Sequence, residues 1–439
     1  MTLAEQVKAA GVVGAGGGGF PTHVKIGSKA DTVIANGAEC EPLLHKDAAV
    51  MEHFSADVVR GVELTMEAVG ASRGFVALKE KNHEAVEAVE KACKGTAVQV
   101  KLLGDYYPAG DEYELVHEVT GRLIPPAGIP LNVGVVVNNV ETLVNVTAAA
   151  NGRPVTHKIL TIAGAVKTPV TLSVPLGTTL RDCIEAAGGA QVGDPILCIG
   201  GMMMGETSDD LETPVTKTTT GAIVLPRSHR VVERKLTPPK AQAGIGKSAC
   251  DQCRYCTEYC PRYLLGYPVE PHQVMRSLAF TATGKDHWNQ WASLCCSCGL
   301  CTLFACPEAL FPKEACDDAK AEMRAAGVKW SGPMTVKEHP MHDGRRVPIK
   351  TLVKRLNLQA YDHPAPLRPE PLKPDRVVLR LKQSAGSAAQ TRLKAGARVT
   401  GGQVVAEPAP NAMGAFLHAP FGAQVESVTD CHLTLARLA

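Results

Sequence analysis

The chain has 439 residues, of which 21% are charged and 4% are aromatic, and its formal net charge is +2. This balance argues against a nucleic-acid partner, because such proteins carry a strongly basic face and aromatic side chains that stack on bases. No stretch approaches the roughly 20 apolar residues that cross a bilayer, and the first residues lack the basic start and apolar core of a signal peptide. We therefore expect a cytoplasmic protein without a transmembrane segment.

The first 152 residues carry the pattern of an α/β domain. Apolar residues at helical spacing predict helices, and short apolar runs bounded by polar residues predict strands. Helices are expected over residues 3–10, 58–69 and 82–94 and from a cap at Asn138 or Asn139 to residue 150, and strands over residues 31–36, 73–79, 97–103 and 134–137.

The rest of the chain divides by composition. Residues 153–233 alternate β-like runs with turns and one helix at 179–187, which predicts a small ubiquitin-like α/β module. Residues 234–246 are rich in Pro, Ala and Lys and are expected to be a linker. The remaining segments are a cysteine-bearing helical region at 247–328, a Pro-rich segment at 329–375 that is expected to be extended, and an all-β module at 376–439.

Fifteen cysteines need an explanation, since structural disulfides are not expected in a reducing cytosol, and ten of them fall between residues 250 and 316. They follow two motifs of the form C-x2-C-x2-C with a fourth cysteine before a proline. In this arrangement the first three thiolates of a motif are ligands of one iron–sulfur cluster, and the fourth thiolate is a ligand of the other cluster. The pattern predicts one [4Fe–4S] cluster on Cys250, Cys253, Cys256 and Cys306, and another on Cys295, Cys298, Cys301 and Cys260.

The second motif departs from the first, because four residues rather than three separate Cys301 from Cys306. Paired zinc ribbons, which also use C-x2-C, are the alternative. Two triplets of cysteines, with no histidine at zinc-finger spacing, favour iron–sulfur clusters. The other cysteines are expected to be small buried hydrophobes, including Cys296, whose spacing to Cys298 does not fit the motif.

Five glycines fall within the six positions from residue 14 to residue 19, in the stretch VVGAGGGGFPTHVK. So much glycine suits a sharp bend or a close approach to a ligand. Gly14, Gly16 and Gly19 satisfy G-x-G-x-x-G, and Glu39 follows 20 residues later, as in a Rossmann NAD site. The residues before the glycines have a helical pattern, however, and a Phe-Pro pair follows them. The motif alone therefore leaves a flexible loop as the alternative.

Three further stretches follow the glycines in order: ANGAECEPLLHKD, YYPAGDEYE and VVVNNVETL. This ordered set resembles the flavin- and NADH-binding subunit of respiratory complex I, and resembles the RnfC-like electron-transfer subunits more strongly. Within this family it is most similar to the cobalamin reductases of propanediol-utilisation microcompartments. The resemblance covers nearly the whole chain. It implies an α/β multidomain protein with an FMN domain, an SLBB-type ubiquitin-like module, a ferredoxin-like helical domain with two [4Fe–4S] clusters, and a C-terminal barrel-sandwich hybrid.

The resemblance also implies site residues by position. Amides of the glycine loop would approach the FMN phosphate with Lys25 nearby, which suits a dianionic group. Phe20 and Glu41 match positions that hold the adenine and ribose of NADH, and Glu41 and Glu112 are the candidate catalytic residues. The implied cofactor-binding residues are Gly14, Gly16, Gly17, Gly19, Phe20, Lys25, Asn36, Glu39, Tyr107, Gly110, Asp111, Asn138, Asn139 and Thr142, with Glu112 beside them.

Two positions depart from the complex I pattern: Ala15 stands where that subunit has arginine, and Ala38 stands where it has aspartate. Both departures are compatible with flavin binding, but they affect the expected affinity for the flavin and the expected contacts with the dinucleotide. Asn36, Asn138 and Asn139 also have a simpler alternative role, because asparagine is a common helix cap and turn residue.

The implied function is an NADH-dependent oxidoreductase that uses FMN and its clusters to reduce cob(III)alamin or cob(II)alamin to cob(I)alamin. The implied partners are cobalamin, a corrinoid adenosyltransferase, shell proteins of a bacterial microcompartment and further copies of the chain. The alternative is an electron-transfer subunit of a membrane-associated complex, like RnfC. Module order favours the first function, because the barrel-sandwich module follows the ferredoxin-like domain here and precedes it in RnfC.

Overall fold

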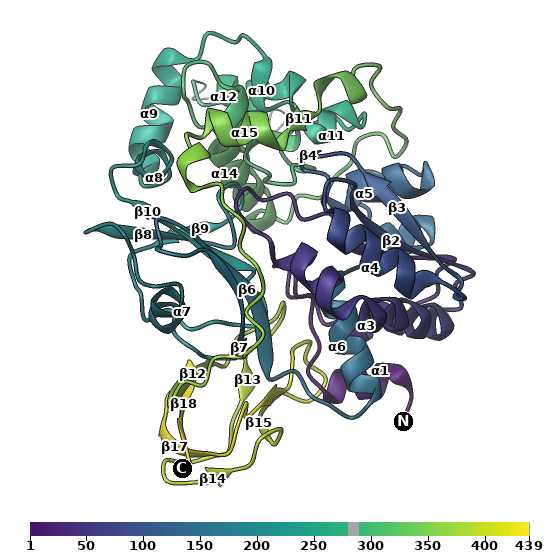
Figure 1. Cartoon of the computed structure of the whole chain (residues 1–439). Helices are drawn as coiled ribbons and strands as arrows, with labels where there is room; N and C mark the ends of the chain where they lie inside the picture. Colours follow the sequence, from purple (N-terminus) through teal and green to yellow (C-terminus); the bar gives the residue numbers. More distant parts are fainter. Residues whose placement is uncertain (280–288, 439) are drawn as a thin grey trace.

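The computed structural model describes residues 1–279 and 289–438, so residues 280–288 of the expected ferredoxin-like domain and residue 439 lie outside the description. In Figure 1 the N-terminal α/β domain lies to the right, the cysteine-bearing helices at the top, a mixed sheet to the left and the C-terminal strands at the bottom. Among the described helices, none combines the length and the apolar character that a membrane crossing requires.

A parallel four-stranded sheet forms the centre of the N-terminal domain. Its strands are β1 (Thr32–Gly37), β2 (Arg73–Lys79), β3 (Val98–Leu103) and β5 (Val135–Asn139). Their spatial order is β3-β2-β1-β5, so the chain order reverses between β1 and β5. In open α/β sheets, ligands bind beyond the carboxyl ends of the strands at such a reversal.

The helices of this domain are α1 (Leu3–Ala9), α2 (Thr22–Ile26), α3 (Lys46–Val69), α4 (His83–Cys93), α5 (Glu112–Thr120) and α6 (Val140–Ala150). The elements expected for residues 1–152 are confirmed, although α3 begins well before residue 58. Phe54 has non-helical angles and marks a kink in α3. α3 and α6 pack closely at Gly61, where a Cβ would lie 2.3 Å from the carbonyl oxygen of Leu143.

The second module is a five-stranded mixed sheet with one helix, which confirms the expected small α/β unit. It contains β6 (His157–Gly164), β7 (Val170–Pro175), α7 (Leu180–Ala186), β8 (Pro195–Ile199), β9 (Glu206–Ser208) and β10 (Gly221–Pro226). The strand order is β7-β6-β10-β8-β9, and β6 and β10 run parallel. Thr179 caps α7 by accepting a hydrogen bond from the amide of Asp182.

Residues 234–246, expected to be a linker, are largely helical instead. α8 covers Arg230–Lys235 and α9 covers Pro239–Ala249. Pro239 occupies the first position of α9, where proline is favoured because its missing N–H is not needed and its backbone angle is already helical. Ala, Gln and Lys are good helix formers and continue the helix, whereas Gly244 and Gly246 each weaken it by about 1 kcal/mol. This mixture explains why the composition of the segment indicates a linker.

The cysteine-bearing region consists of short helices, as expected. They are α10 (Tyr255–Glu258), α11 (Pro261–Leu264), α12 (Pro271–Ser277), η2 (Cys301–Ala305) and α14 (Pro312–Ala325). η2 is a single π-helical turn, in which the amide of Cys306 bonds to the carbonyl of Cys301 at 3.2 Å. A π-turn accommodates one residue more than an α-turn, which accounts for the longer spacing in the second cysteine motif.

The Pro-rich segment at 329–375 is not wholly extended. It contains η3 (Asp343–Arg345), β11 (Val347–Pro348), α15 (Ile349–Arg355) and η4 (Gln359–Tyr361). β11 pairs with β4 (Tyr106–Tyr107) of the N-terminal domain, with Val347 opposite Tyr107. Leu352 and Val353 of α15 are buried in a core shared with the second module, and this burial stabilises the helix. The sequence does not predict this helix because the segment around it is rich in proline.

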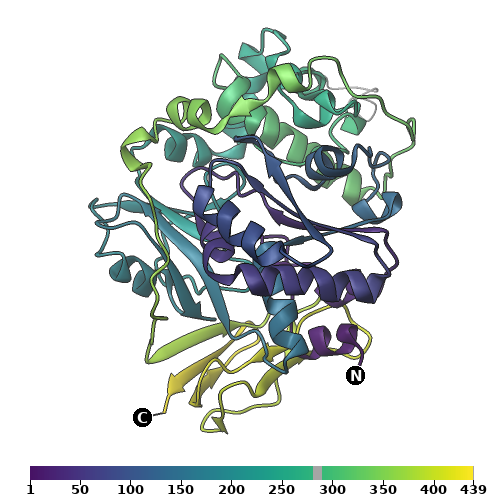
Figure 2. The same cartoon turned by 45° about the vertical axis from the view of Figure 1, so that its right-hand side comes forward.

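The C-terminal segment is all β, as expected. Its strands are β12 (Arg376–Arg380), β13 (Ala389–Gln390), β14 (Arg398–Val399), β15 (Val404–Pro408), β16 (Leu417–His418), β17 (Ala423–Val428) and β18 (His432–Arg437). They form sheets ordered β12-β18-β17-β14 and β13-β15-β16. Val7 of α1 and Val146 of α6 share one hydrophobic core with these strands, and Figure 2 shows the N-terminal helix beside them.

Candidate functional site

A cavity of about 930 Å³ lies beyond the carboxyl ends of β1 and β5, near the upper end of the roughly 300–1,000 Å³ typical of ligand pockets. Both candidate catalytic residues, Glu41 and Glu112, line it. Of the predicted cofactor-binding residues, all except Thr142 also line it: Gly14, Gly16, Gly17, Gly19, Phe20, Lys25, Asn36, Glu39, Tyr107, Gly110, Asp111, Asn138 and Asn139. The structure therefore brings together side chains that are far apart in the sequence.

The glycine loop turns tightly at the edge of this cavity. The amide of Gly19 donates to the carbonyl of Gly14 at 3.1 Å, and the amide of Gly14 donates to the carbonyl of Phe20 at 2.9 Å. Gly17 has φ +109° and no atom within 4 Å of a notional Cβ, so its backbone is open to a ligand. Thr142 lies behind the loop, where its Oγ1 accepts a hydrogen bond from the amide of Ala15 at 2.9 Å.

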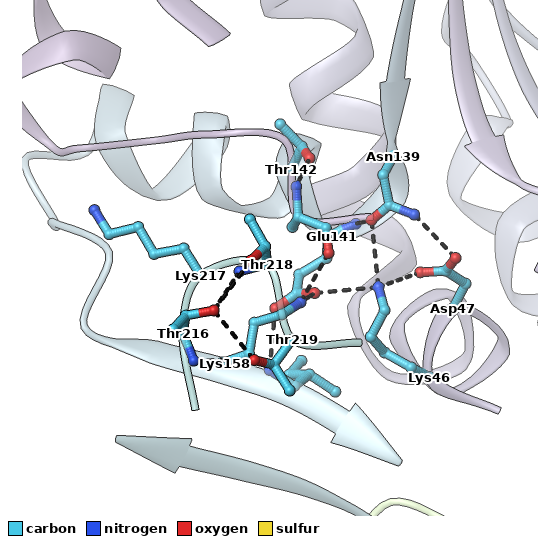
Figure 3. A network of polar contacts seen from close by, with 12 residues as sticks. Lys46, Asp47, Asn139, Glu141, Thr142, Lys158, Thr216, Lys217, Thr218 and Thr219 are labelled. Atoms are coloured by element: carbon cyan, nitrogen blue, oxygen red, sulfur yellow. Dashed lines mark hydrogen bonds and ion pairs between the residues drawn. The ribbon is translucent and has the colours of Figure 1, made fainter. Parts of the chain in front are cut away.

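A buried ionic network supports the glycine loop, and Figure 3 shows its side chains Lys46, Asp47, Glu141 and Lys158. Nζ of Lys158 donates to the carbonyl of Ala15 at 3.0 Å and pairs with Glu141, whose other oxygen accepts from the amide of Ile159 at 3.0 Å. Burial lowers the pKa of Lys158 to about 8. Burial opposes ionisation of Glu141, yet Lys158 and Lys46 hold its pKa below the usual value. The network thus joins the glycine loop, α3, α6 and β6.

Asn138 differs from the two other predicted asparagines. Its Nδ2 is buried without a hydrogen-bond partner among the described residues, and the side chain lines the cavity. Asn139 caps α6 by accepting from the amide of Glu141 at 3.1 Å, and Asn36 donates to the carbonyl of Gly110 at 3.0 Å. The capping or turn role therefore holds for Asn36 and Asn139, whereas Asn138 has a donor left for a ligand.

Two charged residues meet at one edge of the cavity. Nζ of Lys25 donates to the carbonyl of Val137 at 2.7 Å and pairs with Glu112 at 3.2 Å. Glu39, which also lines the cavity, accepts a hydrogen bond from the amide of Asp47 at 2.8 Å. Burial, followed by the charge of Asp47, raises the pKa of Glu39 to about 8.

Glu41 joins the N-terminal domain to the second module. Its two carboxylate oxygens accept from the amides of Met203 and Met204, each at 2.8 Å. Gly201 leaves space for the carboxylate, since a Cβ there would lie 2.4 Å from the Glu41 carboxyl carbon. Burial raises the pKa of Glu41. A contact with a ribose would compete with these bonds, and the dinucleotide role of Glu41 stays a prediction.

The side of the cavity opposite the N-terminal domain is formed by residues of the second module that the sequence patterns do not predict. Thr216, Thr218, Thr219 and Thr220 line it, and we call residues 216–220 the threonine loop. Nζ of Lys217 anchors this loop by donating to the carbonyls of Gly11 and Phe416, each at 2.6 Å, and burial lowers the pKa of Lys217 to about 7. The only signal in the sequence is the run TKTTTG.

Two more residues that sequence patterns did not single out line the cavity: Arg380 of the C-terminal module and Cys296. Cys296 lies beside Cys298 and Arg262 and so is not simple core filling. The hydroxyl of Tyr107 donates to the carbonyl of Cys298 at 2.7 Å. Asp111 caps α5 and pairs with Arg262 at 2.9 Å. The N-terminal domain and the cysteine region therefore meet at this wall.

The cysteines gather in two groups. Cys250, Cys253, Cys256 and Cys306 line one small cavity. Cys260 lies beside Cys295 and Cys296 and not with its own triplet. In both groups the last cysteine of a motif lies with the triplet of the other motif, which is the arrangement that the crossed ligand assignment requires.

Three family models match the chain: the Nuo51 FMN-binding domain over residues 7–148, the SLBB domain over 159–207 and the 4Fe-4S dicluster domain over 249–311. Cobalamin reductase PduS of Citrobacter freundii is 40% identical over 438 residues, which cover 100% of this chain and 97% of the relative. PduS of Salmonella typhimurium strain LT2 is 40% identical over 436 residues, 99% of this chain and 96% of the relative.

One component of the proton-translocating ferredoxin:NAD(+) oxidoreductase complex of Clostridium ljungdahlii is 37% identical over 265 residues. That match covers 59% of this chain and 55% of the relative. The three modules define an electron-transfer oxidoreductase with an FMN-binding domain, an SLBB domain and a 4Fe–4S domain, which confirms the fold class expected from the sequence. The full-length likeness then identifies the family: this chain belongs to the PduS cobalamin reductases.

Replacing Thr142 by valine is expected to lower the free energy of unfolding by about 1–3 kcal/mol, because the buried amide of Ala15 loses its acceptor. Thermal and denaturant unfolding of the flavin-free protein measure the loss. Thr142→Ser keeps the hydroxyl and serves as the control, with a markedly smaller loss expected. Equal losses in the two variants would contradict the anchoring role of the hydroxyl.

Proposed function

We propose that this protein oxidises NADH and reduces cob(III)alamin or cob(II)alamin to cob(I)alamin, with FMN and two [4Fe–4S] clusters as cofactors. The observation that carries this proposal is the shared cavity, because the residues expected to hold FMN and the cysteine Cys298 line the same space. Tyr107 bridges the two sides through its hydrogen bond to Cys298. Electrons leaving the cavity therefore have a short path into the cysteine region.

The cavity suits FMN in three respects. The unpaired Nδ2 of Asn138 offers a buried hydrogen-bond donor, and Gly17 and Gly18 expose backbone that no side chain covers. Lys25 adds positive charge at the edge, which suits a phosphate. When bound, FMN accepts two electrons from NADH as a hydride and releases them singly, and iron–sulfur clusters carry single electrons.

We assign NADH to the part of the cavity between the glycine loop and the threonine loop. Phe20 is 36% exposed there and offers a ring on which an adenine can stack. The threonine hydroxyls are hydrogen-bond donors, and Arg380 is a cation that suits a pyrophosphate. Asn36, Glu39, Tyr107, Gly110 and Asp111 complete the lining around the expected flavin position.

The two cysteine groups support two clusters, each with one ligand from the other motif. The names of the full-length relatives support a corrinoid as the electron acceptor. We extend this to a corrinoid adenosyltransferase as partner and to a location inside a propanediol-utilisation microcompartment. A subunit of a membrane-associated complex is the second candidate, but that likeness covers only 59% of the chain.

The test is NADH-dependent reduction of cob(II)alamin by anaerobically purified protein, followed by the absorbance of cob(I)alamin. Mass spectrometry of the released flavin is expected to identify FMN. Asn138→Leu removes the unpaired donor. This variant should bind little flavin and have at least tenfold lower activity, while its iron content should be unchanged. Asn151→Ala, at the C-terminal end of the following helix α6, is the control and should keep both. FAD as the flavin, a preference for NADPH, or no reduction of cobalamin would contradict the proposal.

The crossed cluster assignment makes a second prediction. Cys260→Ala should damage the cluster on Cys295, Cys298 and Cys301 and leave the other cluster with all its ligands. Cys296→Ser should keep both clusters, since Cys295 has the spacing that the motif requires. Iron analysis and EPR of the reduced variants distinguish these outcomes. Two intact clusters in Cys260→Ala, or loss of one in Cys296→Ser, would overturn the assignment.

A further inference from the structure

Three potential metal ligands converge at the junction between α5 and the Pro-rich segment. They are His117 of α5 and, from the segment, Glu338 and His342. One ligand atom from each lies within 4.8 Å of the others. We propose that His117, Glu338 and His342 bind one zinc ion, at a site separate from the flavin cavity and from the predicted cluster cysteines.

Glu114 orients the imidazole of His342 for this role. Nε2 of His342 lies 2.9 and 3.0 Å from the two carboxylate oxygens of Glu114, and both side chains are 3% exposed. An ionised carboxylate only accepts hydrogen bonds, so Nε2 carries the proton and Nδ1 keeps its lone pair. A carboxylate behind a histidine in this way is the usual support of a metal-binding imidazole.

Nδ1 of His342 faces Glu338. Nδ1 lies 2.7 Å from Oε1 of Glu338 but makes no hydrogen bond in this geometry. Nε2 of His117 lies 3.6 Å from Oε2 of the same carboxylate, which is too long for a hydrogen bond. Zinc bonds of about 2.0–2.2 Å place the ligands of a tetrahedral site about 3.4 Å apart. The His117–Glu338 distance is close to this value, whereas Nδ1 of His342 and Oε1 of Glu338 would have to move apart as zinc binds.

The surroundings favour a cation at this position. Carboxylates lie beside both nitrogens of the His342 imidazole, Glu114 at Nε2 and Glu338 at Nδ1, and their charge would offset that of a bound cation. A proton on Nδ1 would make the approach to Glu338 an ion pair, which is the alternative to zinc that the metal analysis tests. Asp343 brings a carboxylate oxygen to 3.7 Å from Nδ1, but this oxygen also pairs with Arg346 at 3.3 Å, so a water is expected in the fourth position. Two imidazoles with carboxylate oxygen are a typical zinc donor set.

A metal at this site would fix the Pro-rich segment, residues 329–375, which joins the cysteine-bearing region to the C-terminal module. Residues 338–342 precede β11, which pairs with β4 and places Val347 opposite Tyr107. Tyr107 in turn bonds to Cys298 at the wall of the large cavity. Zinc would therefore hold the Pro-rich segment against α5 close to the contact between the N-terminal domain and the cysteine region.

The test measures zinc and iron together in the cluster-loaded, full-length protein by mass spectrometry of the metals. Wild type is expected to hold one zinc per chain after incubation with Zn²⁺ and removal of the excess. His342→Gln and His117→Gln should lose that zinc and keep the iron. Glu338→Gln alters a side chain that is 39% exposed, so it tests the same loss with little risk to folding. His339→Gln, three residues from His342, is the matched control and should retain zinc.

Cobalt replaces zinc as a spectroscopic probe of the donors. Co²⁺ bound at this site should give visible bands of nitrogen and oxygen ligation without the near-ultraviolet bands of thiolate ligation. Absence of zinc from wild type, or retention of zinc in His342→Gln and Glu338→Gln, would overturn the proposal. Thiolate bands would do the same, since they would place the metal on the cysteines.

Discussion

The position of the glycine loop depends on a carboxylate that is buried between two lysines. Glu141 pairs with Lys158 and Lys46, and Lys158 also holds the carbonyl of Ala15 in the loop. Charges taken out of water destabilise a fold unless each one is paired, and removing one partner leaves the others uncompensated. This network therefore fixes the glycine loop relative to α3, α6 and β6. The part of the cavity that the loop lines is held in a defined position as a result.

The other walls of the cavity depend on contacts between modules. Glu41 holds the second module through the amides of Met203 and Met204, and Lys217 holds the threonine loop to the carbonyls of Gly11 and Phe416. Tyr107 holds the cysteine region through Cys298. No single module contains the site. Residues of all four modules line or anchor the cavity, so its shape depends on how the modules pack.

Local patterns in the sequence predicted most elements and the two cysteine motifs, because hydrophobic spacing and ligand spacing are properties of short segments. The same patterns do not predict the helices α9 and α15, since proline is found both at helix starts and in extended segments. The threonine loop, Arg380 and Cys296 line the cavity only because distant modules pack there. The anchoring role of Thr142, behind the loop, likewise depends on packing and has no local signature.

In the proposed mechanism one cavity connects the sites of the dinucleotide and the flavin with the iron–sulfur clusters. Anaerobic titration of the cluster-loaded protein with NADH, without any corrinoid, tests it most directly. Flavin absorbance and the EPR signal of the reduced clusters are recorded on the same rapidly frozen samples. We predict that the flavin bleaches and the cluster signal appears within the time of one turnover. A flavin that is fully reduced while the clusters stay EPR-silent would contradict the account.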